Sequence, residues 1–406
     1  GPAVGVPEPT APPSFFGSLG FSYIGPVDGH DVVALEAALR EASAHDGPVV
    51  VHVHTVKGRD YSPAEHDGEK CLHDVSPFDV ETGLPRVPRG SVPTYTEAFG
   101  TALLHEAAVR PEVVAITAAM TGPTGLIPFA ERHGDRIVDV GIAEQHAVTA
   151  AAGMAMGGLR PVVAVYSTFL NRAWDQVVHD VGLHHLPVVF CLDRAGVTGD
   201  DGPSHHGIFD LALLTKVPGM TVFAPSSYEE VAVMLHDALE LCDGPVAIRW
   251  PKTPARHSAE TGGGLHARRV RSGDGSVCLL GVGKLLDACE KAAAELDAQG
   301  ISATVWDVRV SPLDPDMLAD AASHDLVVTA EDGIAEGGVG ASVAAALRTG
   351  LGGDGLPARV VVCGLPLAYL PHGKPDEILA AHGLDGRGIA GAVLRALDAS
   401  DAGRAF

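Results

Sequence analysis

Short apolar runs recur along the chain, and each is followed by a stretch of helical length. Examples are Val113–Thr117, Arg160–Tyr166, Pro187–Leu192 and Val246–Trp250. Nearly continuous β-branched runs are typical of strands buried in a parallel sheet, because crossover helices cover both of its faces. Strands that alternate with helices predict a doubly wound architecture. The sequence therefore predicts an α/β fold.

The chain has 406 residues, enough for two or three domains that each bury a core. Its first α/β segment has two strands and two helices, too few for a complete doubly wound domain, so we interpret it as the end of a third domain. The predicted segments are a flexible Pro-rich start at 1–13, a domain remnant at 14–81, a linker at 82–93, a complete domain at 94–253, a linker at 254–275 and a second complete domain at 276–406.

Composition limits the partners of this chain. With 51 acidic against 28 basic residues, the net charge of -23 disfavours nucleic acid and anionic membranes. No apolar run approaches the roughly 18 residues that span a bilayer, and we expect no signal peptide. The cysteines lack CxxC spacing, so we expect reduced thiols and no metal ligands within the chain. These features predict a cytoplasmic protein.

Glu144 stands at a predicted strand-to-helix junction. The apolar run Arg136–Val138 leads through Gly141 to the small-residue run Thr149–Met156, which we predict to be a buried helix. In open α/β sheets, ligands bind at the carboxyl ends of strands. A desolvated carboxyl group there suits proton exchange with a ring nitrogen. The alternative is that Glu144 caps the helix, and local spacing alone favours that cap.

The segment Asp193–Gly207 is the densest polar cluster. It follows a predicted buried strand and contains one Arg, three Asp, two His and four Gly in 15 residues. The glycines allow the backbone to turn sharply and to approach a ligand. A solvated surface loop, the alternative, needs neither neighbouring histidines nor this glycine density. The pattern favours a functional loop.

The segment Tyr166–Arg172 also follows a predicted strand and begins a predicted helix, Phe169–His179. Ser167 or Thr168 could be its N-cap. Phe169 could stack on an aromatic ligand, although a core phenylalanine is the commoner meaning.

Basic and glycine-rich segments offer two candidate anion sites. A basic residue in Arg249–Lys252, together with Arg194, would form the pocket that a phosphorylated substrate needs. The alternative for Lys252 is an ordinary exposed lysine. The run Gly333–Gly340 follows a strand and begins a helix, so it could bind phosphate, but close packing of the strand against the helix explains it equally well.

Taken together, these motifs resemble the 1-deoxy-D-xylulose-5-phosphate synthases of the transketolase superfamily, which use thiamine diphosphate. The resemblance runs from about Phe15 to the C-terminus. It implies that the chain takes part in decarboxylating pyruvate and transferring a two-carbon unit to glyceraldehyde 3-phosphate. The motifs that carry it are Gly141–Thr149, Asp193–Gly207, Tyr166–Arg172 and Gly25–Asp31.

The resemblance also implies roles for individual residues. Glu144 would contact the aminopyrimidine ring of the cofactor, on whose face Phe169 would stack. The assignments are proton handling by Glu144, His73, Asp201 and His205, cofactor contacts by Phe169, Lys57, Tyr61, Ile142 and Arg172, and substrate contacts by Tyr166, Arg194 and Lys252.

Two departures from the family pattern matter. The Gly-Asp-Gly…Asn motif that binds Mg²⁺ and diphosphate belongs before residue 1, so we expect the metal ligands outside this chain. Lys252 stands where the family has Arg, which replaces a bidentate grip with a point charge. We expect a second chain that carries the diphosphate-binding domain, a homo-oligomer, or both. Alternatives are a shortened form of a full-length enzyme and a non-catalytic binding relative.

Overall fold

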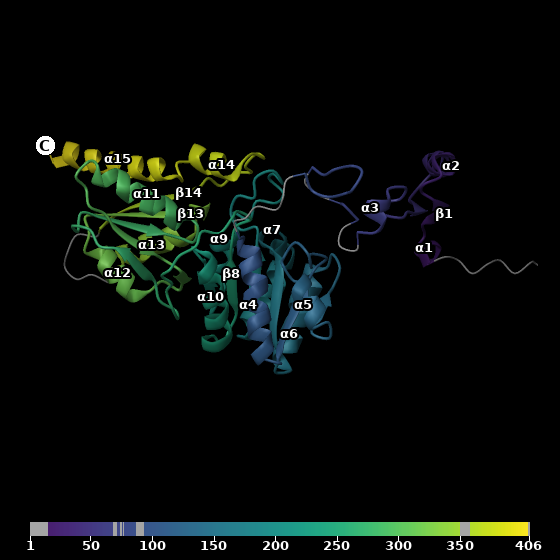
Figure 1. Ribbon diagram of the computed structural model, residues 1–406, viewed down its shortest axis with the longest axis horizontal. Helices are drawn as coiled ribbons and strands as arrows, with labels where there is room; N and C mark the ends of the chain where they lie inside the picture. Colours follow the sequence, from purple (N-terminus) through teal and green to yellow (C-terminus); the bar gives the residue numbers. More distant parts are fainter. Residues whose placement is uncertain are drawn as a thin grey trace, which may run out of the picture. The chain divides into compact units, whose positions relative to one another are not determined.

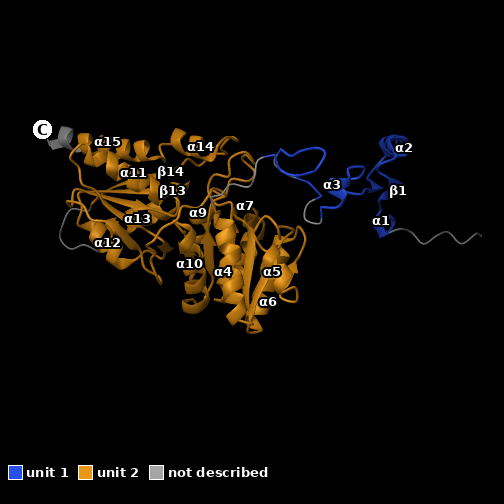
Figure 2. Cartoon of the chain, viewed as in Figure 1, with its two compact units in different colours: residues 1–89 blue, residues 90–406 orange. Residues whose placement is uncertain are grey.

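The protein is seen here as a computed structural model that describes residues 15–67, 71–73, 75, 77–86, 93–349 and 358–404. The predicted flexible start, residues 1–13, lies outside the described residues. The chain divides into two compact units, residues 1–89 and 90–406 (Figure 2), and each is described by itself.

The first unit is built on two parallel strands, β1 (Ser22–Asp28) and β2 (Val49–His54). Between them, α2 (Val32–Ser43) begins at Asp31, whose carboxylate accepts from two backbone amides of the first turn. Two short helices complete the unit, α1 (Phe15–Ser18) and α3 (Ser62–Glu65). Among its described residues, Ala38 and Ala64 are the buried hydrophobic ones, so this piece has almost no core of its own.

The second unit contains a seven-stranded sheet in the order β12-β7-β8-β6-β5-β3-β4, parallel except for the edge strand β12. The strands β3, β5, β6, β7 and β8 are mostly buried, as the apolar runs predict, whereas the edge strand β4 is only partly buried. The strand bounds are β3 (Val113–Thr117), β4 (Ile137–Asp139), β5 (Arg160–Tyr166), β6 (Val189–Asp193), β7 (Thr221–Phe223), β8 (Val246–Arg249) and β12 (Val310–Ser311).

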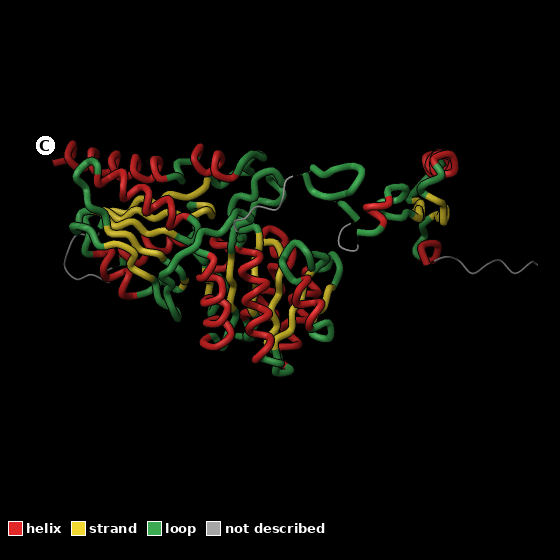
Figure 3. The backbone as a smooth tube through the Cα atoms, viewed as in Figure 1, coloured by secondary structure: helices red, strands yellow, loops and turns green. Residues whose placement is uncertain are grey.

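Alternate strand residues point to opposite faces of this sheet, and helices cover both (Figure 3). One face packs against α4 (Tyr95–Val109), α5 (Ile127–Arg132) and α10 (Tyr228–Leu241). The other packs against α6 (Glu144–Met156), a broken helix at 167–182 and α9 (Asp210–Leu214). This is the doubly wound arrangement that the sequence predicts.

A second sheet has the order β14-β13-β10-β11-β9, with β9 antiparallel. Helices α11 and α15 lie on one face and α12 and α13 on the other (Figure 1). The bounds are β9 (Arg268–Arg271), β10 (Val277–Gly281), β11 (Thr304–Asp307), β13 (Leu326–Ile334), β14 (Arg359–Leu365), α11 (Leu285–Asp297), α12 (Pro315–Ala322), α13 (Val339–Arg348), α14 (Pro375–Ala381) and α15 (Gly386–Arg404).

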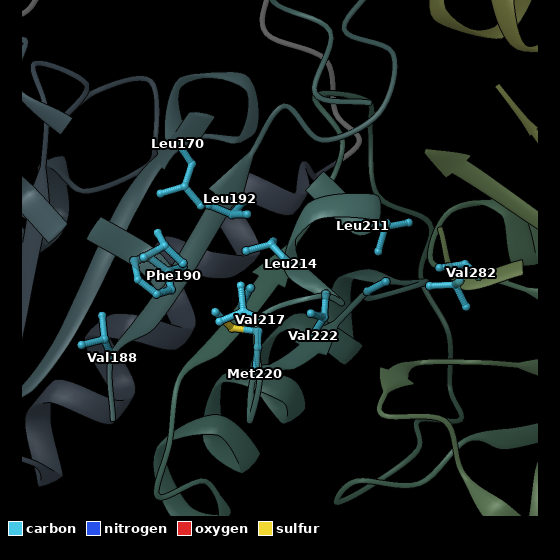
Figure 4. Packing of buried hydrophobic residues seen from close by; sticks show 14 of the residues in the cluster. Leu170, Val188, Phe190, Leu192, Leu211, Leu214, Val217, Met220, Val222 and Val282 are labelled. Atoms are coloured by element: carbon cyan, nitrogen blue, oxygen red, sulfur yellow. The ribbon is translucent and has the colours of Figure 1, made fainter. Parts of the chain in front are cut away.

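The two sheets share one hydrophobic cluster. Figure 4 shows Phe190, Leu214 and Met220 of the seven-stranded half, with Val282 reaching the cluster from the other half. In addition, β12 follows the second sheet's β11 in sequence yet pairs with β7 of the first. Shared core and shared strand make residues 90–406 one packed body.

Three local features differ from the sequence expectations. The segment predicted as the second linker contains β9. The predicted helix Phe169–His179 is broken into α7 (Ser167–Leu170), η1 (Asn171–Ala173), α8 (Trp174–Gln176) and η2 (Val177–Gly182), the last with π geometry. Neither Ser167 nor Thr168 is its N-cap, because α7 begins at Ser167 with Tyr166 in the cap position.

Candidate functional site

Glu144 is buried at the start of α6, with 3% of its surface exposed. Ala143 holds the N-cap position without a side-chain cap bond, and Glu144 is the first residue of the helix, so its carboxyl group lies in the first turn as the helix-cap alternative requires. In addition, Arg172 donates from Nη1 to Glu144 Oε2 at 2.6 Å. The two predicted cofactor contacts are therefore neighbours, brought together from different elements.

Asp139 holds the turn that leads to Glu144. Its carboxylate accepts from the amides of Ala119 at 2.8 Å and Gly141 at 2.9 Å, and from the Thr121 hydroxyl at 3.1 Å. Gly141 has φ of +67°, a conformation that glycine adopts without strain. Asp139 is not among the residues predicted for the site, although Asp followed two residues later by Gly is a recognisable turn signal.

Four candidate residues form a stack of rings and one guanidinium. Arg194 lies over the Tyr166 ring, 4.3 Å from its centroid. The Tyr166 and Phe169 rings are parallel with centroids 5.6 Å apart, and His205 meets Phe169 edge-on at 5.4 Å. The broken helix at 167–182 thus presents Phe169 to His205 and, three residues later, Arg172 to Glu144.

The remaining polar candidates are paired as well. Lys252 Nζ lies 2.7 Å from Asp201 Oδ2, and both side chains are partly exposed. Arg194 also donates to the Pro123 carbonyl at 2.7 Å and pairs with Asp193 at 2.8 Å. Lys252 and Asp201 are therefore accessible to a ligand, whereas Arg194 is largely buried and fixed.

The loop Asp193–Gly207 is not a solvated surface loop, because residues 195–199 are all buried. Backbone bonds between Gly196 and Gly207, at 2.8 and 2.9 Å in the two directions, close its base. His206 is buried, and its Nδ1 accepts from the Thr198 amide at 3.1 Å, so Nε2 is the protonated nitrogen facing the Pro371 carbonyl. His206 is thus structural, and His205 faces the aromatic rings.

The other candidates are Ile142 in the second unit and three residues of the first unit. Ile142 is 76% exposed on the turn before α6. Lys57, Tyr61 and His73 belong to the first unit. There, Lys57 and His73 are exposed and the Tyr61 hydroxyl donates to the Val80 carbonyl at 2.7 Å. Their roles remain predictions.

The amides of the glycine-rich run Gly333–Gly340 are already bound to a carboxyl side chain. Glu331 accepts from the amides of Val339 at 3.0 Å and Gly340 at 2.8 Å, which are the donors a phosphate would need. The carboxylate also fills the space beside Gly338. Of the two alternatives for this run, the structure supports packing and not phosphate binding.

Burial raises the pKa of Glu331 to about 7, although the two amide bonds act to lower it. The folded protein therefore keeps this proton at pH values where the unfolded chain, with its ordinary value of 4.5, has lost it. Proton binding is greater in the folded state between these values, so the free energy of unfolding should fall as pH rises from about 4.5 to 7.

Urea unfolding of Glu331→Gln at a series of pH values tests this. In this variant we expect the free energy of unfolding to fall less steeply with rising pH, because the substitution removes one titrating group. Burial also raises the pKa of Asp307 to about 7, so part of the pH dependence should remain. Glu336→Gln, at an exposed carboxylate of the same segment, should leave the slope unchanged. Identical slopes in Glu331→Gln and the unmodified protein would refute the assignment.

The described part of the chain offers no group of three or more His, Cys, Asp or Glu side chains able to hold a metal ion. Within the same residues, no helix is long and apolar enough to cross a membrane.

Comparison with known families agrees with this architecture. Residues 91–257 match the family described as "Transketolase, pyrimidine binding domain", and residues 265–389 match "Transketolase, C-terminal domain". The chain thus contains a transketolase pyrimidine-binding domain and a transketolase C-terminal domain. Residues 6–55 match the family "1-deoxy-D-xylulose-5-phosphate synthase". The resemblance inferred from the sequence motifs is thus confirmed.

Curated 1-deoxy-D-xylulose-5-phosphate synthases are similar to nearly all of this chain. The protein from Thermobifida fusca is 46% identical over 393 residues, which cover 95% of this chain and 61% of that protein. Synthase 1 from Kitasatospora griseola is 47% identical, covering 95% and 59% respectively. The chain therefore spans about three-fifths of the length of these relatives.

Two solved structures share the fold. A protein described as "Split gene transketolase, inactive beta4 tetramer" superposes with a TM-score of 0.68 at 29% identity, over 75% of this chain and 99% of its own. Transketolase from Campylobacter jejuni gives a TM-score of 0.63 at 16% identity, over 94% and 68%. The second likeness concerns the fold alone.

Proposed function

We propose that this chain supplies the pyrimidine-binding half of a 1-deoxy-D-xylulose-5-phosphate synthase. The assembled enzyme would decarboxylate pyruvate and transfer the two-carbon unit to glyceraldehyde 3-phosphate. The observation that carries the proposal is the buried carboxylate of Glu144, held by Arg172 at the carboxyl edge of the sheet.

The residues present fit the pyrimidine end of thiamine diphosphate. Glu144 provides a fixed carboxyl group for a ring nitrogen, and the half-buried Phe169 provides an aromatic face. When bound, the cofactor would supply the carbon nucleophile of the reaction. This chain's part would be to orient the ring, to hold a proton at Glu144 and to move protons near the substrate through Asp201 and His205.

Magnesium and diphosphate would be held by residues outside this chain. We propose a partner that carries the Gly-Asp-Gly…Asn motif, as a separate subunit or a preceding segment of the same protein. The near-absence of a core in the first unit supports this, because its two strands need further elements to form a stable sheet. A cytoplasmic location belongs to the same proposal.

The direct test is product formation. The chain and a protein carrying the diphosphate-binding domain would be mixed with thiamine diphosphate, Mg²⁺, labelled pyruvate and glyceraldehyde 3-phosphate. We expect labelled 1-deoxy-D-xylulose 5-phosphate by mass spectrometry. Carbon dioxide release with a different acceptor product would refute the acceptor, and an assembled, cofactor-loaded complex without any turnover would refute the function.

Lys252 is proposed to hold the phosphate of the acceptor. In Lys252→Ala, we expect KM for glyceraldehyde 3-phosphate to rise about 10- to 100-fold, the scale of one hydrogen bond to a charged group, with KM for pyruvate nearly unchanged. The fold should tolerate the change, because the pair with Asp201 is partly exposed and contributes little stability.

Steady-state kinetics with each substrate varied in turn measures this difference. Lys216→Ala, at an exposed lysine of the same sheet domain, is the matched control and should leave both constants unchanged. Equal increases of the two constants in Lys252→Ala would remove the phosphate role.

A further inference from the structure

A buried ionic network joins the two sheets of the second unit. Arg249, at the end of β8, donates from Nε to Asp210 Oδ2 at 3.0 Å and from Nη2 to Asp210 Oδ1 at 3.3 Å. Its Nη1 donates to Oδ1 of Asp332 on β13. All three side chains are 1–2% exposed, so solvent does not screen their charges.

The network lies against the base of the loop Asp193–Gly207. Asp332 is so close to Gly196 that a Cβ added there would lie 2.3 Å from Asp332 Oδ2, an oxygen without a hydrogen-bond partner among the described residues. On the other strand of the base, Ser167 Oγ lies 3.1 Å from Asp210 Oδ2 and 3.4 Å from the Gly207 carbonyl. Gly196 therefore contacts the network directly, and Gly207 is connected to it through Ser167.

The same network reaches the proposed ligand-contacting residues through short lengths of chain. Ser167 follows Tyr166 directly, Gly207 comes two residues after His205, and Arg249 comes three residues before Lys252. Asp332 belongs to β13 of the second sheet, so a shift of this residue would displace the base of a loop that belongs to the first sheet. We propose that Asp332 is a positioning residue, which holds the loop carrying Asp201 and His205 from the neighbouring sheet.

Only the expected effect on kinetics rests on the proposed function. The effect of Asp332 on the position of the loop can be measured in the isolated chain. Asp332→Ala removes one of the two carboxylates that accept from Arg249, together with the side chain next to Gly196. Hydrogen–deuterium exchange of amides 195–207 in the purified chain should then become about tenfold faster or more, because this segment opens locally. Asp332→Asn retains the volume and one oxygen, and should give a smaller increase at the same amides.

Glu230 provides a matched control. It forms another fully buried ion pair, with Arg309 Nε at 2.8 Å, and its carboxylate also accepts from the Gly262 amide outside the loop. Glu230→Ala should speed exchange near 262–266 and leave 195–207 unchanged. If neither Asp332 variant speeds exchange at 195–207 beyond the Glu230→Ala result, the positioning role is wrong.

In the assembled enzyme, Asp332→Ala should lower kcat by about tenfold or more, with KM for pyruvate within about threefold, because misplaced catalytic groups slow the chemical step. A rise in KM with unchanged kcat would overturn the role. If the unmodified assembly does not turn over pyruvate, the proposed function fails, and the exchange measurement still decides whether Asp332 holds the loop.

Discussion

Replacing Glu144 with glutamine is expected to lower pyruvate turnover of the assembled enzyme by about 10²- to 10⁴-fold, the range for loss of a general acid or base. An amide has the shape of the carboxyl group but cannot exchange a proton with a ring nitrogen. Its carbonyl oxygen can still accept the Arg172 bond that the carboxylate accepts at 2.6 Å. The fold should therefore survive the substitution.

Turnover would be measured together with thermal unfolding, which should shift by no more than a few degrees. Glu131→Gln, at an exposed carboxylate on α5, is the control and should retain full activity. A normal rate in Glu144→Gln would favour the alternative in which the chain is a non-catalytic binding relative. A lost rate with an unfolded protein would be a packing effect, and the melting curve separates the two.

The chain alone is expected to show no measurable thiamine-diphosphate-dependent decarboxylation of pyruvate, even with Mg²⁺. The sequence has two Gly-Asp-Gly runs, and one of them, Gly353–Gly355, lies outside the described residues. The other, Gly273–Gly275, follows β9, which runs antiparallel to β11 and therefore ends away from the carboxyl edge of the parallel strands. Its carboxylate is also engaged locally, because Asp274 accepts from the Ser276 amide at 3.0 Å and hydroxyl at 2.6 Å. A site with half of its cofactor contacts should bind too weakly for turnover.

Adding a protein with the Gly-Asp-Gly…Asn domain should restore activity to this chain, measured as carbon dioxide release. The control is the same partner mixed with the Glu144→Gln variant, which should stay inactive. This result would show that the restored activity depends on the site in this chain and does not come from the partner alone. Robust turnover by the isolated chain would contradict the proposed division of the site between two domains.

Several strands were predicted nearly to the residue, such as β3 and β5, because a parallel strand buried on both faces must be apolar throughout. The broken helix at 167–182 was missed. Its residues keep a helical pattern of apolar positions, while the 3₁₀ and π turns that redirect Phe169 and Arg172 change the number of residues per turn. The spacing of apolar residues is judged over several turns, so it does not reveal a change in the number of residues in a single turn.

The buried charges show the same limit. Arg249 in an otherwise apolar strand is a sequence signal that a buried partner must exist, because an unpaired buried charge is very costly. The signal does not say which acid the partner is. Asp332 lies 83 residues away, on the neighbouring sheet, and only the packing of the two halves brings it to the arginine.

The sequence by itself determined the α/β class, the polar loop Asp193–Gly207 and the junction at Glu144, because periodicity and glycine placement report burial and turns. The tertiary structure decided the partners. Glu144 meets Arg172 from 28 residues away, and Asp201 meets Lys252 from 51. Such pairs depend on the order of the strands in the sheet and on the path of the helices that connect them. The residue types along the chain do not show which strands will have neighbouring carboxyl ends.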